Sequence, residues 1–69
     1  MNKLDELAMA ERHVRLGEAH VEGQKARIAQ LRCAGLNTAL AEQLLATFET
    51  TLISHRGHLD LIRSELGLD

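Results

Sequence analysis

The sequence of 69 residues contains no proline, tryptophan or tyrosine, one phenylalanine and one cysteine. A single cysteine, Cys33, excludes an internal disulfide framework and a cysteine-rich zinc module. The aromatic and β-branched runs that strands favour are missing, whereas Ala, Leu, Glu, Gln and Arg, which favour helices, are abundant. The composition therefore predicts an all-α protein with a reduced thiol.

Long apolar runs are also missing. In "NKLDELAMAERHV", directly after Met1, charges interrupt every apolar run, so no secretory segment of about 7–15 residues and no membrane span of about 20 can be drawn. The net charge is −2, and Lys and Arg do not cluster as a phosphate-binding surface requires. We expect a cytoplasmic protein with one domain over residues 1–69, no membrane partner and no nucleic-acid partner.

The clearest interruption of helical sequence is "CAGLNTA", Cys33 to Ala39. Gly35 suits the left-handed position after a helix end, and Thr38 or Asn37 can cap the next helix. The sequence thus predicts helices near residues 3–33 and 38–66, each about 42–46 Å long. Matched lengths and a short turn predict an antiparallel helical hairpin.

A seven-residue repeat runs through both predicted helices and indicates a coiled-coil seam. Its a positions are Leu7, Val14, Val21, Ile28, Leu45, Leu52, Leu59 and Leu66, and its d positions are Ala10, Gly17, Gln24, Leu31, Ala41, Phe48, His55 and Ile62. Antiparallel pairing places large residues against small or polar ones, as in Gln24 with Phe48 and Gly17 with His55. Interdigitating layers need this alternation.

The e positions carry charges that test the same register. Antiparallel pairing predicts four pairs of opposite sign: Glu11 with Arg63, Glu18 with Arg56, Lys25 with Glu49, and Arg32 with Glu42. Each exposed pair contributes only about 0–1 kcal/mol, so the pairs fix orientation more than stability.

The opposite side of the seam, at the c and g positions, is nearly uncharged, and we call it the neutral flank. It comprises Met9, His13, Leu16, His20, Gly23, Leu40, Leu44, Thr47, Thr51, Ser54, His58 and Leu61. An exposed apolar stripe of this length is typical of an interface. We expect a twofold homodimer that forms a four-helix bundle, although a tetramer fits the pattern too. Gly23 is then either a site of close backbone approach or a tolerated surface glycine.

The stretch "ISHRGHL" places His55 and His58 three residues apart, and the register brings His13 across from His58. His55 falls in the seam and reads first as a packing residue in the space that Gly17 leaves. A zinc, nickel or copper site made by the three imidazoles is a minority hypothesis, and no metal or other cofactor is expected. A pH-dependent role at the interface is another alternative. Gly57 has no role in this register except as a partner contact.

Catalytic constellations are missing from the sequence: it has no Gly-rich phosphate loop, no Ser/His/Asp or Cys/His arrangement on loops, and no carboxylate pair in a cleft. A tight turn and two termini offer little from which to build a pocket. We therefore expect a protein that is not an enzyme.

Two long segments, "AERHVRLGEAHVEGQKARIAQLR" and "GLNTALAEQLLATFETTLISHRGHLDLIRSELG", resemble a group of short helical-hairpin proteins of alphaproteobacterial type. The shared features are a late glutamine and arginine in the first helix, a Gly and Thr at the turn, an "LL-x-x-F/L-E-x-x-L" run and paired histidines. This resemblance implies no activity. The architecture is similar to the dimer of Rop-type hairpins, which bind paired RNA loops.

These features predict a non-enzymatic helical interaction or oligomerisation protein, an adaptor or small regulator that acts as a homodimer and presents helix faces to a further protein. A Rop-like nucleic-acid-binding regulator is the alternative, and it requires a basic stripe from Arg12, Arg15 and Lys25 or Arg27. A further alternative is a histidine-lined metal-binding or pH-responsive bundle. Phosphatases of sporulation response regulators fit less well, because "LAEQLLATF" stands where their Ser-Gln-Glu-Leu-Asp motif is expected.

Overall fold

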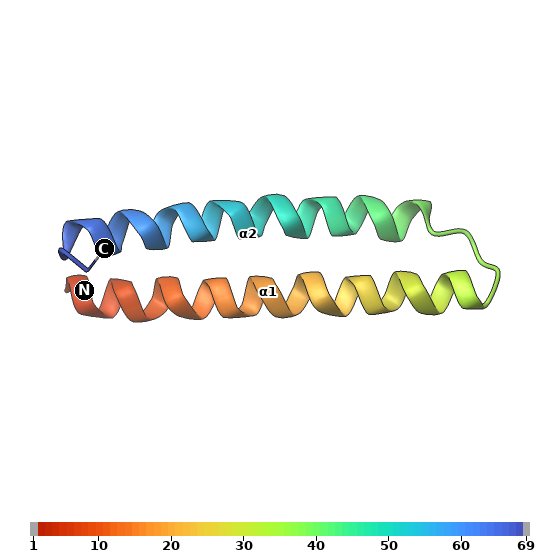
Figure 1. Cartoon of the computed structure of the whole chain (residues 1–69), viewed down its shortest axis with the longest axis horizontal. Coiled ribbons are helices and arrows are strands. Elements are labelled where there is room, and N and C mark those ends of the chain that lie inside the picture. Colours follow the sequence, from red (N-terminus) through yellow and green to blue (C-terminus); the bar gives the residue numbers. More distant parts are fainter. Residues whose placement is uncertain (1, 69) are drawn as a thin grey trace.

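The computed structural model describes residues 2–68 and contains two helices, α1 (Lys3–Cys33) and α2 (Ala39–Glu65). They run side by side in opposite directions, with both termini at one end and the turn at the other (Figure 1). The hairpin measures 49 × 20 × 14 Å. The predicted antiparallel helical hairpin is confirmed. The second helix is one residue shorter at each end than predicted, because Thr38 and Leu66 are its caps.

Side chains before each helix satisfy backbone donors that have no partner within the helix. The carboxamide oxygen of Asn2 accepts a hydrogen bond from the backbone N–H of Asp5 at 2.8 Å. Before α2, Thr38 occupies the N-cap position, but its hydroxyl donates to Glu42. The side chain of Asn37 instead accepts from the backbone N–H of Ala39 at 2.7 Å. Of the two predicted capping residues, Thr38 occupies the N-cap position and Asn37 accepts the capping hydrogen bond.

Both helices end in the same backbone motif. Gly35 and Gly67 each have a φ of 71°, the left-handed conformation that glycine adopts without steric cost. After α1, Leu36 N–H donates to the carbonyl of Leu31 and Gly35 N–H to that of Arg32, and the same pair of bonds follows α2. This is the Schellman motif, so the predicted role of Gly35 is confirmed.

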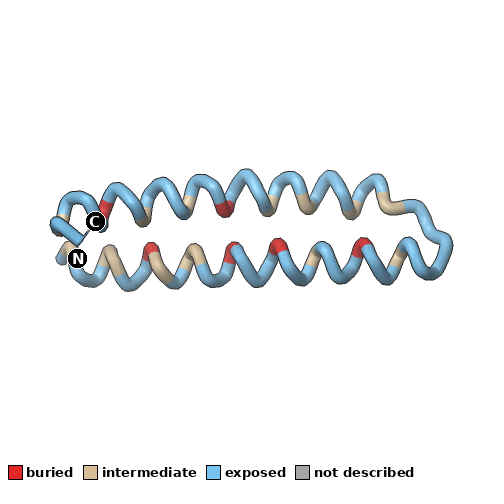
Figure 2. The backbone as a smooth tube through the Cα atoms, in the orientation of Figure 1, coloured by how far each residue is buried: buried red, intermediate tan, exposed pale blue. Residues whose placement is uncertain are grey.

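The seam is at least half-buried along its whole length. All sixteen predicted a and d residues are buried or half-buried, and the buried positions lie where each helix faces the other (Figure 2). Among the described residues the largest fully buried side chain is that of Ile62, at 2% exposure. The heptad pattern therefore identifies the packed face of each helix correctly.

The space beside Gly17 is filled differently from the prediction. A Cβ added at Gly17 would lie 3.0 Å from Cδ1 and 3.7 Å from Cα of Leu52, so Leu52 fills the space expected for His55. His55 is only half-buried and contacts the ring of His13. Even Cα of Leu52 lies close to Gly17, so at this point a d position of α1 faces an a position of α2 rather than a position of the same letter.

Gln24 is the amide inside the seam. Its Nε2 donates to the backbone carbonyl of Ala41 at 2.8 Å, in a part-buried position. The bond joins α1 to the first turn of α2 and satisfies the amide donor without water. Gln24 thus fixes the turn end of the hairpin.

Candidate functional site

The flank that carries the e positions is charged and holds the hairpin in register. Arg32 donates to Glu42 at 2.8 Å, and Arg56 donates to Glu18 at 3.2 Å. Both pairs were predicted and join the two helices. Their side chains are about half exposed, so solvent screens the attraction.

The other two predicted pairs do not form among residues 2–68. Lys25 turns to Glu22 on its own helix, at 3.7 Å, instead of crossing to Glu49. Glu11 and Arg63 are not paired either. An exposed lysine gains little from any one carboxylate, and a partner three residues away on the same helix is reached at lower entropic cost.

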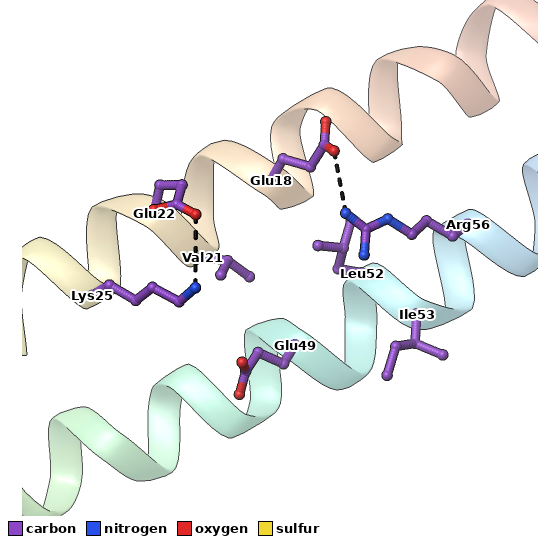
Figure 3. Close-up of a pocket in the computed structure, with 8 residues that line it drawn as sticks. All are labelled: Glu18, Val21, Glu22, Lys25, Glu49, Leu52, Ile53 and Arg56. Carbon is purple, nitrogen blue, oxygen red and sulfur yellow. Dashed lines mark hydrogen bonds and ion pairs between the residues drawn. The ribbon is translucent and has the colours of Figure 1, made fainter.

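A shallow groove of about 450 Å³ runs along the charged flank. Figure 3 shows its lining: Glu18, Val21, Glu22, Lys25, Glu49, Leu52, Ile53 and Arg56. The dashed contacts in this view are the ion pairs Glu18–Arg56 and Glu22–Lys25. Three carboxylates face two cations across an open surface, so the charges here largely neutralise one another.

The ends of the two helices beside the termini are joined by Lys3. Its ammonium lies 3.1 Å from Glu65 on α2 and 3.3 Å from Glu6 on α1. The hydrogen bond to Glu65, followed by that to Glu6, raises the pKa of Lys3 above its usual value of 10.5. Lys3 therefore keeps its charge throughout the neutral range and closes the open end of the hairpin.

The neutral flank has the opposite character. Every predicted interface residue on it is exposed in the single chain except His13, which is half-buried. Its large apolar side chains are 44–81% exposed: Met9, Leu16, Leu40, Leu44 and Leu61. Single apolar side chains scattered over a surface are common in soluble proteins. A row of them along one face is typical of an interaction surface.

Two hollows lie along the neutral flank and bring the histidines together. The larger, about 190 Å³, is lined by His13, Leu16, Gly17, His20, Phe48, Thr51 and His55. Within it the rings of His13 and His55 have centroids 5.1 Å apart, and the ring of His20 stacks on Phe48 at 5.3 Å. The smaller, about 140 Å³, brings His13 and His58 together with Glu6, Met9 and Ala10.

The metal hypothesis for His13, His55 and His58 does not gain support. Between Asn2 and Leu68 no group of three His, Cys, Asp or Glu side chains is placed to hold a metal ion. His13 contacts the ring of His55 and shares a hollow with His58, but the three imidazoles do not converge on one point. Their arrangement is that of side chains lining a surface.

The glycines in the helices differ in surroundings. A Cβ added at Gly23 or Gly57 would meet no atom within 4 Å, so the hairpin itself does not require glycine there. Gly23 lies on the neutral flank, and Gly57 lies on the outer face of α2. The lone thiol, Cys33, is exposed beside the turn.

The basic residues required for a Rop-like stripe have different surroundings. Lys25 lies in the charged groove with three glutamates. In the heptad register Arg12, Arg15 and Lys25 occupy neighbouring f, b and e positions of α1, whereas Arg27 occupies a g position across the seam.

Across residues 2–68, neither helix contains an apolar stretch long enough to cross a membrane. Comparison with protein-family models, with curated proteins and with solved structures found no match to this chain.

Proposed function

We propose that this chain is a non-enzymatic helical interaction protein that associates with itself through the neutral flank and acts as an adaptor or small regulator. The observation that supports the proposal is the row of five exposed large apolar side chains on one face of the hairpin. The opposite face carries the ion pairs and stays in water. Two neutral flanks packed together make a four-helix bundle with twofold symmetry.

The area of the chain favours a second copy as the occupant of this flank. A monomeric protein of 7.6 kDa usually exposes about 4,300 Å², whereas this chain exposes 4960 Å². The broad face of the hairpin measures 49 × 20 Å, and a standard interface buries about 800 Å² on each partner. The flank is thus large enough for a stable dimer.

Charges at the two ends of the flank favour an antiparallel arrangement of the copies. Glu6 and Glu65, which share Lys3, leave one net negative charge at the end with the termini. Arg27 lies toward the turn. We place the twofold axis near the middle of α1. Measured along the helix, Arg27 of one copy then lies about 13 Å from the axis, and Glu6 of the other copy lies about 18 Å from it on the same side. Long side chains bridge that offset, while a parallel arrangement would bring like charges together.

Sedimentation equilibrium over micromolar to millimolar concentrations tests the proposal. The parent chain should form dimers, and Leu44→Glu should shift the equilibrium toward monomer by placing a charge in the interface. Ile53→Glu is the matched control, because Ile53 is 68% exposed and lines the groove on the charged flank, away from the proposed interface. A parent chain that remains a folded monomer at all concentrations would refute the proposal, as would equal effects of the two substitutions.

A further inference from the structure

The ionisable groups of the neutral flank are distributed unevenly. The chain has four histidines, and three of them, His13, His20 and His58, occupy g positions on this flank. The fourth, His55, lies at the edge of the seam and lines the same hollow as His13 and His20. Between Glu6 and Glu65 at one end and Arg27 toward the other, histidine is the only ionisable residue type on the flank. Its charge therefore depends on imidazole protonation.

The neighbours of these imidazoles offer little compensation for positive charge. His20 faces Phe48 and Thr51 of α2 and Leu16 of α1, none of which titrates. His55 faces His13 across the seam. His13 and His58 share their hollow with one carboxylate, Glu6, which Lys3 already binds at 3.3 Å.

On the basis of the self-association proposed above, we propose that these histidines make assembly through the neutral flank dependent on pH. With neutral imidazoles, two flanks pack as uncharged surfaces. With protonated imidazoles, each flank carries a row of positive charges at the contact, and the copies repel one another. Histidine is the side chain that changes charge between pH 5 and 8, so assembly forms at pH 7.5 and weakens toward pH 5.5.

The size of the effect follows from proton linkage. Each ordinary imidazole that has to lose its proton on association lowers the association constant about tenfold at pH 5.5. A twofold dimer contains two copies of every histidine, so the effect of each position enters twice. One such position per chain therefore weakens the dimer about 100-fold between pH 7.5 and pH 5.5.

The experiment is sedimentation equilibrium at pH 7.5 and pH 5.5 in the same 150 mM salt, with helix content measured by circular dichroism at both pH values. The triple substitution H13Q, H20Q and H58Q removes the three imidazoles at g positions of the neutral flank, keeps polar side chains there, and leaves His55 at the edge of the seam. As a matched control, A26H adds an imidazole at an exposed position on the outer face of α1. We expect the parent and the A26H variant to weaken about 100-fold at pH 5.5, and the triple variant to bind nearly equally at both.

The outcomes separate this inference from the proposed function. A parent dimer of equal affinity at both pH values would refute the pH dependence and leave self-association standing. A monomer at both values would overturn self-association and the pH dependence with it. A triple variant that keeps the full pH effect, or a parent that loses its helix content at pH 5.5, would also overturn the role of these histidines.

Discussion

Gly57 and Gly17 both lie inside helices, and we expect alanine to have opposite effects at the two positions. At Gly57 a new Cβ meets nothing within 4 Å, so the substitution gains the full difference in helix propensity. Alanine is favoured over glycine in a helix interior by about 1 kcal/mol. Gly57→Ala should therefore raise the free energy of unfolding by about that amount.

Gly17→Ala gains the same propensity but meets a neighbour. The new Cβ would lie 3.0 Å from Leu52 Cδ1 and 3.6 Å from its Cβ. Overpacking a well-packed core costs about 1–3 kcal/mol, and the low half of that range applies because the tip of Leu52 can move. The net result should be a loss of up to about 1 kcal/mol relative to the parent.

Urea and thermal unfolding followed by circular dichroism measure both variants. For a chain of this size 1 kcal/mol corresponds to a shift of about 4–8 °C in Tm, so the variants should differ by at least that much. All samples need the same protein concentration, because self-association raises apparent stability. If Gly17→Ala were as stable as Gly57→Ala, the packing of Leu52 against Gly17 would be refuted.

Three further predictions follow from the same contacts. Gly23→Ala should stabilise the hairpin as much as Gly57→Ala. It should also weaken dimerisation in sedimentation, because of these two glycines only Gly23 lies on the neutral flank. Gln24→Ala should lower the free energy of unfolding by about 1 kcal/mol through loss of the bond to Ala41, while Gln24→Leu should cost less in the same urea titration. Spin labels on Cys33 should lie about 45 Å apart in an antiparallel dimer, whereas a pulsed electron–electron distance below about half of that would indicate parallel copies.

The fold could be read from the sequence because the heptad signal was repeated. Four a and four d positions in each helix gave the same buried face, and the opposite charges of Arg32 with Glu42 and of Arg56 with Glu18 gave the direction independently. All sixteen seam residues are buried or half-buried. A pattern with this much redundancy tolerates a polar residue such as Gln24 without losing its register.

The side-chain contacts between g positions of α1 and d positions of α2 could not be predicted from the sequence so directly. Pairing positions of the same letter missed the contacts of His13 with His55 and of His20 with Phe48, which join g positions to d positions. Gly17, a d position, lies directly against the backbone of Leu52, an a position, so the layers of this hairpin pair positions of different letters. Lys25 pairs with Glu22 on its own helix at 3.7 Å, because a carboxylate three residues away is reached at lower entropic cost than one across the seam.

Gly67 shows a signal that sequence reasoning could have used. It follows the last turn of α2 as Gly35 follows α1, and both have a φ of 71°. A glycine directly after the final apolar seam residue is the usual mark of a Schellman ending. Reading Gly67 in this way would have placed the end of α2 one residue earlier, at Glu65.

The narrowness of the seam links stability to assembly. Small residues at Ala10, Gly17 and Ala41 keep the helices close, and the buried apolar residues among those described include only four larger than alanine: Val21, Ile28, Leu52 and Ile62. A core this small rarely supplies more than about 3–5 kcal/mol. A second copy that binds only the folded hairpin adds stability that grows with concentration. If protonated histidines separate the copies, acid removes that increment, so Tm should rise with protein concentration at pH 7.5 and lose this dependence at pH 5.5.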